Sequence, residues 1–475
     1  MNPLLQLPAT TLQEMIRTRE ISPVDLVRAS LERAHAVQPV LNCFITLCDD
    51  AAMKQAQEAE NAIMRGESLG ALHGIPFTVK DIVNTAGVRT TFGTVLHRDH
   101  VPEEDAISVA RLKRAGGILL GKTTTPEFGS QPFTRSPLFG ETRNAWSAER
   151  ISGGSSGGAA VATAAGVTPL AVATDGGGST RIPAACNGLV GIKQSLGVVP
   201  HSQAQDLFGN QTYVTPTTRT VADTGLMLQI MSGPSSIDPW SVNTGCRNYV
   251  GAARALGDFK GKRIRYNAAP ENRPVSRDVQ ERFEESLALL ESMGATLEPF
   301  DGQGFIVESI WRTVNHTVWR SRFLKLVEQH GQTFSDTFRE QILSAESFSA
   351  ADYQEAMFAR ARLYRELETL FDSADLLVTP TLTRSAISIN DDLSSPLEID
   401  GKRYEGLRSH WYPWTMVFNM TGHPAITLPC GFGKDGLPLG IQFATRFGSD
   451  EALLRYASLY EAGAPEHFRL PEIQL

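Results

Sequence analysis

Ser179 stands where its hydroxyl could attack a carbonyl carbon. It follows three consecutive glycines in ATDGGGSTRIPAAC, residues 173–186, between a predicted strand (LAVATD, 170–175) and a predicted helix start. Glycines let the backbone take unusual angles and let a ligand approach closely, and consecutive N–H groups at a helix start suit an oxyanion. The pattern favours a nucleophile beside an oxyanion site. The alternative is a glycine-rich turn in which Ser179 only caps the helix.

Lys80 is the candidate base, because a serine nucleophile needs a group that accepts its proton. The stretch GIPFTVKDI, residues 74–82, predicts a short buried strand that ends on Lys80. Burial disfavours the charged form of a lysine, and only a neutral lysine can act as a base. The alternative is a strand-end Lys80 that pairs with Asp81, and the residues alone leave both interpretations open.

A second glycine- and serine-rich stretch, ISGGSSGG at 151–158, could be a linker or part of a catalytic site. Within it, GGSSG matches the nucleophile elbow G-x-S-x-G, which would make Ser155 the nucleophile of a Ser-His-Asp α/β-hydrolase. That elbow needs a preceding strand, and RNAWSAERIS is not a convincing one. It also needs a downstream histidine, and none of the candidates has an informative context: His201, His316, His330, His410, His423 and His467.

The stretch GGILLGKT, 116–123, matches the phosphate-binding loop of NTPases. In that loop a strand delivers free N–H groups to a helix N-terminus. Here the predicted order is reversed, since a helix over 105–115 precedes the glycines and ILLGKT is itself strand-like. The NTPase interpretation is therefore the least favoured.

Strands and helices alternate along the chain, which predicts an α/β protein with a large mixed, mostly parallel central sheet covered by helices on both faces. Residues 1–66 are predicted to be helical, with Ser22 as an N-cap, and 276–294 and 305–371 form further helical regions. Additional predicted strands are KRIRY (262–266), DLLVTPT (375–381), and AITLP (425–429) with LGIQFAT (439–445) as a hairpin. We expect one domain over 1–475: helical region 1–66, catalytic core 67–235, and helices with the remaining sheet over 236–475.

Composition excludes several classes of function. The 475 residues carry a net charge of −8 with no strongly basic block, which argues against nucleic-acid binding. No signal peptide is apparent, and the uncharged stretch 151–174 is too rich in small residues for a membrane span. Five cysteines without a CxxC pair (Cys43, Cys48, Cys186, Cys246, Cys430) predict reduced thiols in a cytoplasmic protein, and no HExxH or other metal-ligand cluster occurs.

Taken together, these stretches resemble the amidase signature hydrolases. The resemblance rests on GIPFTVKD, LLGKTTTPEFG, ISGGSSGG, TDGGGSTRIPAACNGLVGIK, RTVAD (219–223) and NMTGHPAITLPCG (419–431). They span most of the chain in the family's order, and the 24-residue spacing between Ser155 and Ser179 is also that of the family. The resemblance implies the amidase signature fold.

The resemblance also implies the roles of individual residues. Ser179 corresponds to the nucleophile, Ser155 to a bridging serine that follows a cis peptide from Gly154, and Lys80 to the base. The implied oxyanion hole consists of the backbone N–H groups of Gly176, Gly177, Gly178 and Ser179. Such an enzyme works through an acyl-enzyme and needs neither a cofactor nor a metal.

The sequence departs from the family pattern at three places. GIKQSLG (191–197) stands where Lys-Pro-Thr is usual, TPTTRT (215–220) begins with Thr in place of Gly, and Ala159 replaces a usual Ser. None of these touches the implied Ser-Ser-Lys triad, so the predicted chemistry is unaffected. They weaken inference of the substrate from relatives.

The expected substrate is a small neutral, aryl or apolar amide or carbamate, with esterase or urethanase activity as related options. Trp311, Trp319, Trp411, Tyr412 and Trp414 could line an apolar pocket or simply pack in the core. The alternative within the family is the glutaminase-like subunit of a tRNA-dependent amidotransferase. No nucleic-acid or membrane partner is expected, and a homodimer is left open.

Overall fold

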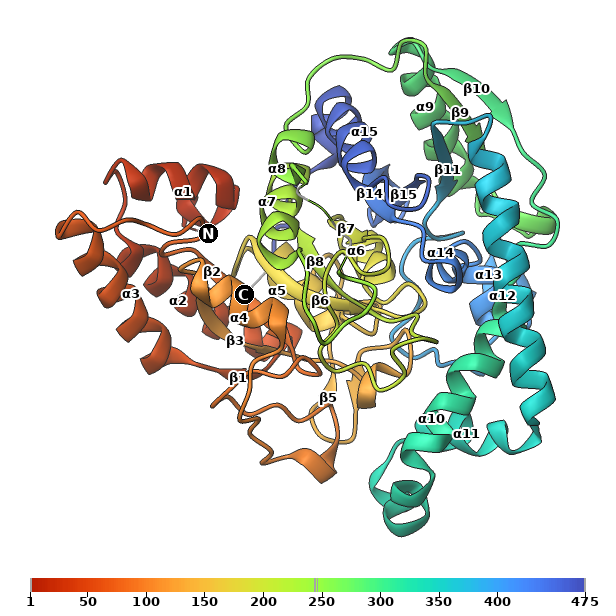
Figure 1. The fold of residues 1–475 in the computed structure, drawn as a ribbon, viewed down its shortest axis with the longest axis horizontal. Helices are drawn as coiled ribbons and strands as arrows, with labels where there is room; N and C mark the ends of the chain where they lie inside the picture. Colours follow the sequence, from red (N-terminus) through yellow and green to blue (C-terminus); the bar gives the residue numbers. More distant parts are fainter. Residues whose placement is uncertain (1, 243–244, 246, 474–475) are drawn as a thin grey trace.

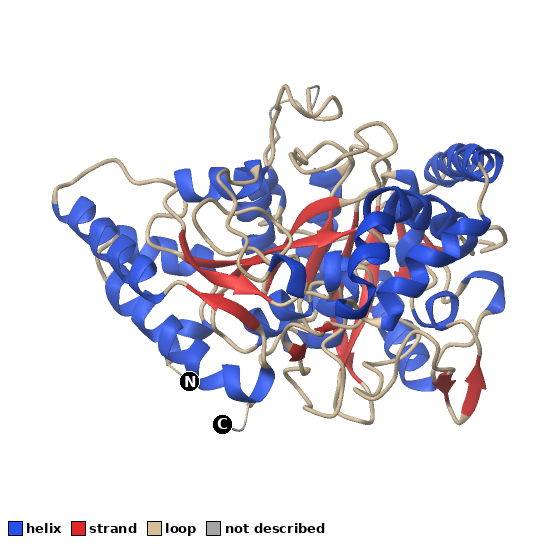
Figure 2. Cartoon of the chain, turned by 90° about the horizontal axis from the view of Figure 1, so that it is seen from below, coloured by secondary structure: helices blue, strands red, loops and turns tan. Residues whose placement is uncertain are grey.

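A single 11-stranded sheet runs through the molecule in the computed structural model, which describes residues 2–242, 245 and 247–473. Figure 2 shows the strands passing through the middle of the chain with helices on either side. In spatial order the strands are β1 (Phe44–Leu47), β3 (Ile118–Thr123), β2 (Pro76–Lys80), β6 (Leu170–Asp175), β8 (Tyr213–Thr218), β7 (Val190–Lys193), β14 (Ala425–Phe432), β15 (Pro438–Ala444), β11 (Leu376–Pro380), β9 (Arg263–Tyr266) and β10 (Thr296–Pro299).

Two small two-stranded sheets lie outside this sheet. They pair β4 (Arg135–Ser136) with β5 (Gly140–Glu141), and β12 (Leu397–Ile399) with β13 (Lys402–Tyr404). The α-helices are α1 (Ala9–Arg17), α2 (Pro23–Leu41), α3 (Asp49–Met64), α4 (Ile107–Arg114), α5 (Gly157–Ala164), α6 (Arg181–Asn187), α7 (Val221–Met231), α8 (Tyr249–Ala252), α9 (Arg277–Ser292), α10 (Glu308–His330), α11 (Asp336–Ser344), α12 (Ala350–Phe371), α13 (Leu407–Trp411), α14 (Thr415–Thr421) and α15 (Asp450–Gly463).

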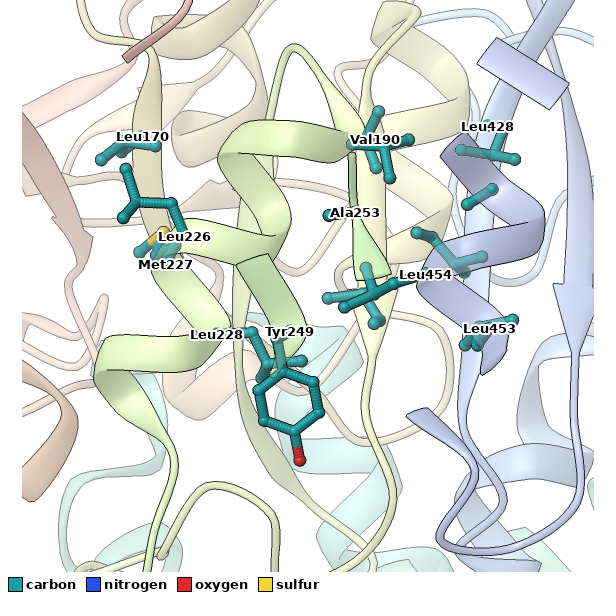
Figure 3. Packing of buried hydrophobic residues seen from close by; sticks show 14 of the residues in the cluster. Leu170, Val190, Leu226, Met227, Leu228, Tyr249, Ala253, Leu428, Leu453 and Leu454 are labelled. Carbon is teal, nitrogen blue, oxygen red and sulfur yellow. The ribbon is translucent and has the colours of Figure 1, made fainter. Parts of the chain in front are cut away.

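Figure 1 shows α1 to α3 at one end of the molecule and α10 to α12 at the other, with the sheet between them. Side chains of α7, α8 and α15 pack over one face of the sheet centre (Figure 3). There Leu226 and Leu454 lie in the same apolar cluster as Leu170, Val190 and Leu428 of the strands. The opposite face carries α5 and α6, and Ala159 of α5 packs on Ala171 and Ala173 of β6. The small side chains of α5 allow this close approach of helix and strand.

The predicted mixed sheet with helices on both faces is confirmed, but the expectation that it is mostly parallel is wrong. Among the described strands, β2 with β3, β2 with β6, β9 with β11, and β9 with β10 are parallel. The other six pairings of neighbouring strands are antiparallel. A buried strand reads as an apolar run in either direction, so the pattern predicts strands without predicting their orientation.

Most predicted elements lie where expected, and the misses are strands: β1, β7, β8 and β10 were not predicted. The predicted strands at 74–82, 118–123, 170–175 and 375–381 correspond to β2, β3, β6 and β11, and the predicted hairpin is β14–β15. By contrast, β1 lies inside the region predicted to be helical. This strand of four residues joins the sheet edge through β3, a long-range pairing that local sequence does not reveal. The boundaries at 66 and 235 stay a prediction.

Cys43, Cys48, Cys186 and Cys430 are free thiols, and Cys246 lies outside the described residues. Over the part of the chain that is described, no helix combines the length and the apolar character that crossing a membrane requires.

Candidate active site

The Lys80 side chain is fully buried at the end of β2 and faces three hydroxyl groups. Its Nζ lies 2.7 Å from Ser155 Oγ, 2.9 Å from Ser156 Oγ and 2.8 Å from Thr174 Oγ1. Burial lowers the pKa of Lys80 well below its ordinary value, and the negative charge of Asp175 opposes this only in part. A neutral amine can donate two hydrogen bonds and accept one, so three hydroxyls satisfy it without a carboxylate.

Ser155 lies in a buried loop that leads into α5. The peptide bond between Gly154 and Ser155 is cis, and every residue from Ile151 to Gly158 is buried. A Cβ atom at Gly154 would lie 2.7 Å from the carbonyl carbon of Pro132, so only glycine fits there. The stretch is therefore a tightly packed part of the site and not a linker.

The nucleophile elbow and the phosphate loop, both disfavoured from the sequence, are absent from these stretches. Immediately before Ser155 the described backbone makes only isolated bridges, at Arg150 and Ile151, where an elbow needs a strand. Residues 118–123 form β3, and Lys122 Nζ is buried against the Val83 carbonyl and the hydroxyls of Thr85 and Thr90. Because Lys122 is buried against these groups, its amine is not available to bind a phosphate group.

Ser179 lies in the turn between β6 and α6, and the carboxylate of Asp175 organises that turn. Asp175 accepts hydrogen bonds from the N–H of Gly178 at 2.7 Å and of Thr180 at 3.2 Å. It also pairs with the guanidinium of Arg181 at 2.9 and 3.0 Å, and both side chains are fully buried. Although burial raises the pKa of Asp175, the charge and hydrogen bonds of Arg181 hold it below its usual range.

Two side chains hold the carbonyl groups of Gly176 and Gly177 in place. Trp311 Nε1 donates to Gly176 O at 2.8 Å, and Thr415 Oγ1 donates to Gly177 O at 2.8 Å. Since C=O and N–H point in opposite directions across a trans peptide, these bonds also set the direction of the next N–H. The N–H of Gly178, one of the four predicted oxyanion donors, already donates a hydrogen bond to Asp175.

A cavity of about 200 Å³ opens beside the two serines. Ser155, Thr174, Gly176, Gly177 and Ser179 all line it, whereas Gly178 does not. The Ser156 N–H donates to the Ser179 carbonyl at 3.1 Å, which ties the two serine-bearing segments together. The structure therefore brings Lys80 into contact with Ser155, and places Ser155 and Ser179 on the wall of one cavity.

Several aromatic side chains line this cavity. Trp311, Trp319 and Tyr412 line it, together with two phenylalanines that sequence analysis did not single out, Phe92 and Phe128. The other two aromatic residues considered from the sequence, Trp411 and Trp414, are almost fully buried in the core. The predicted aromatic set is thus divided between pocket and core.

The cavity lining also contains polar residues. It includes residues of the loop 201–212 and two arginines, Arg322 and Arg408, and among these sequence analysis had considered only His201. Of the six histidines considered for a Ser-His-Asp enzyme, His201 is the one that lines the cavity, and burial lowers its pKa to about 4. Neither Ser155 nor Ser179 is among the hydrogen-bond partners of its ring nitrogens in the described part of the chain.

Known proteins resemble this chain over nearly its whole length. A family model for amidases matches residues 25–454. An acylamidase from Rhodococcus erythropolis is 36% identical, covering 97% of this chain and 96% of that protein. A component of the glutamyl-tRNA(Gln) amidotransferase of Geobacillus thermodenitrificans is 30% identical, covering 97% and 98%. The crystal structure of a bacterial aryl acylamidase of the amidase signature family superposes with a TM-score of 0.92 at 26% identity, covering both chains completely.

Proposed function

Because the chain belongs to the amidase signature family and is an amidase that hydrolyses carbon–nitrogen bonds, we propose that Ser179 attacks the carbonyl of a small amide and forms an acyl-enzyme. One observation carries this proposal. A fully buried Lys80 touches Ser155, and Ser155 shares a cavity wall with Ser179. That arrangement offers a route for a proton from the Ser179 hydroxyl through Ser155 to the lysine.

The proposed reaction uses this route twice. As Ser179 Oγ bonds to the carbonyl carbon, its proton passes to Ser155, and Ser155 gives its own proton to neutral Lys80. The proton then returns through Ser155 to the leaving amine when the C–N bond breaks. Water attacks the acyl group in the second half, with the same relay accepting its proton and restoring Ser179.

The charge that develops on the carbonyl oxygen needs backbone donors. We assign this role to the N–H groups of Gly176, Gly177 and Ser179, which belong to residues on the cavity wall. The N–H of Gly178 holds Asp175 and so fixes the shape of the turn. Its contribution to oxyanion binding is therefore indirect.

The substrate class follows from the aromatic wall. Rings of Phe92, Phe128, Trp311 and Trp319 would pack against an aryl or apolar part of the substrate. The relatives named acylamidase and aryl acylamidase support such a substrate. Carbamates and esters present the same carbonyl carbon to Ser179, so we include them as slower or alternative substrates.

A glutaminase-like role is the second candidate, because relatives at 30% identity are components of a glutamyl-tRNA(Gln) amidotransferase. Release of ammonia from glutamine, compared with release of aniline from acetanilide, separates the two candidates. We expect kcat/KM to favour the anilide. Preference for glutamine, with partner proteins that co-purify, would establish the second candidate instead.

The proposal is tested by labelling the nucleophile. A fluorophosphonate should modify the wild-type protein once, and peptide mass spectrometry should place the label on Ser179. Ser179→Ala should lose the label and reduce kcat by about 10⁴-fold or more, because a nucleophile acts as a unit with its base.

Ser108→Ala is the matched control, since Ser108 is a buried serine on α4 that does not line the cavity. This variant should be labelled and active like wild type. Label on Ser155, together with an active Ser179→Ala enzyme, would contradict the assignment and restore the nucleophile-elbow interpretation.

A further inference from the structure

The cavity contains a buried positive charge that no carboxylate of the described residues neutralises. Arg408 on α13 is only 8% exposed and lines the cavity. Its Nη2 donates to the amide oxygen of Gln341 at 2.6 Å, and its Cζ lies 5.5 Å from the ring centroid of Trp311. Within the described residues, no carboxylate oxygen lies within 4 Å of the Arg408 guanidinium nitrogens.

Two buried arginines outside the cavity show how this protein satisfies a structural guanidinium. Arg219 is 7% exposed and donates to the backbone carbonyls of Leu5 and Leu7, whereas Arg181 pairs with a carboxylate. The Arg181 guanidinium is fully buried and pairs with Asp175 at 2.9 Å, with Gln442 and Asn419 as further partners.

An uncompensated buried charge is costly, and a guanidinium carries five N–H donors that favour a carboxylate. The partners of Arg408 among the described residues are neutral, chiefly Gln341 and Tyr412. Because Arg408 lines the cavity, an anion bound there would satisfy its remaining N–H donors.

Trp311 connects Arg408 with the reacting centre. Its Nε1 donates to the Gly176 carbonyl, and its ring faces the Arg408 guanidinium. Arg408 is therefore about one indole ring away from the turn that carries Ser179. A group bound to Arg408 would belong to the same small molecule whose carbonyl reaches Ser179.

Other charged groups at the cavity do not cancel this one. Arg322 adds a second positive charge at the more exposed side, where its guanidinium lies over the Phe323 ring. Asp206 is the carboxylate on the wall, and its Oδ1 accepts the N–H of Gly209 at 2.8 Å. Burial keeps His201 neutral at pH 7, since it lowers its pKa to about 4. The wall is thus net positive.

We propose that Arg408 is a specificity-determining residue that binds a carboxylate of the substrate, so that the preferred substrates are amides bearing a carboxylate on their acyl or amine part. This inference rests on the proposed hydrolysis at Ser179 and deepens it. It replaces the neutral substrate expected from the sequence with an anionic one, while the aromatic wall still binds the apolar part.

Two matched pairs of anilides test the proposal. For the acyl side, 4-oxo-4-(phenylamino)butanoate is compared with 4-oxo-N-phenylpentanamide, in which a methyl group replaces the anionic oxygen. For the amine side, 4-acetamidobenzoate is compared with 4-acetamidoacetophenone. In at least one pair the wild-type enzyme should favour the carboxylate by about tenfold or more in kcat/KM, mainly through a lower KM.

Arg408→Gln should remove this preference in the same pair. The preference is the kcat/KM of the carboxylate divided by that of the ketone. Dividing the wild-type preference by the variant preference cancels the electronic difference between the two compounds. The matched control is Arg384→Gln, which removes a partly buried arginine that does not line the cavity and should keep the wild-type preference. Each compound is also tested as a competitor of Ser179 labelling, so that a poor substrate still reports binding.

The outcomes separate this inference from the proposed function. A wild-type preference for the ketone in both pairs would overturn the inference, as would an Arg408→Gln enzyme that loses activity equally on both members of the favoured pair. In either case Ser179 would still be labelled and the proposed function would stand. Absence of turnover together with absence of Ser179 labelling would overturn the proposed function itself.

Discussion

Two lysines on neighbouring parallel strands, Lys80 of β2 and Lys122 of β3, are both fully buried but lie on opposite faces of the sheet. The register pairs Lys122 with Val79, and Lys80 with Thr123. Because side chains alternate between faces, Lys122 lies on the face of Val79 and Lys80 on the other. A register shift just before these pairs produces this arrangement, since a one-residue shift reverses which face each later side chain meets.

The two surroundings differ in what they offer the amine. Lys122 is held by the Val83 carbonyl and two threonine hydroxyls, and the charge of Asp81 partly opposes the lowering of its pKa by burial. Lys80 touches three hydroxyls, and two of them, on Ser155 and Thr174, belong to residues that line the cavity. Burial alone therefore does not make a catalytic lysine. The difference is a connection to a reacting group.

The largest expected effect is the difference in kcat between substitutions of these two lysines. Lys80→Met should lower kcat by about 10²- to 10⁴-fold, the usual contribution of a general base, while the protein remains folded. Lys122→Met removes an equally buried amine and should reduce thermal stability, yet keep kcat per folded molecule within about tenfold of wild type. Steady-state kinetics with circular dichroism and thermal melts make the comparison. Equal losses of kcat in both variants would show that burial, and not the connection through Ser155, is what matters.

A smaller effect concerns the hydroxyls around each amine. Thr174→Val removes one of the three partners of Lys80, which should lower kcat about fivefold because a lost hydrogen bond costs about 1 kcal/mol. Thr85→Val removes the corresponding partner of Lys122 and should leave kcat unchanged. Both variants are measured with the same anilide. A loss in Thr85→Val as large as in Thr174→Val would remove the distinction between the two sites.

Much of this comparison could be predicted from the sequence. The apolar run before Lys80 and the helix–strand order around Lys122 correctly predicted both strands, and so argued against a phosphate loop at 116–123. The family resemblance supplied Ser155 and Ser179 as candidates. The register shift that separates the two lysines leaves no local signal, because it depends on how β3 pairs with β2.

Residues that shape the cavity from a distance were missed for a similar reason. Arg408 and Phe128 are far from Ser179 in sequence, and only the packing of α10, α13 and the loop after β3 brings them to the cavity wall. Asp175 and Arg181 flank the glycines within the motif itself, so their opposite charges were a usable signal for a buried pair. The position of Ser156 next to Ser155 was another usable signal in the sequence.

The most direct test of the central claim is the rate of Ser179 labelling by a fluorophosphonate as a function of pH. Lys80 accepts a proton only when it is neutral, and burial lowers its pKa well below the ordinary value of about 10.4. In the wild-type enzyme the labelling rate should therefore be low at pH values below that lowered pKa and high above it. This rise is the acid limb of the pH profile.

Lys80→Met should lose this limb and label slowly at all pH values, whereas His201→Gln should keep the wild-type limb. His201 is the informative control, because it lines the same cavity and its pKa is lowered to about 4. A limb that persists in Lys80→Met, or that disappears in His201→Gln, would contradict the assignment of Lys80 as the base that activates Ser179.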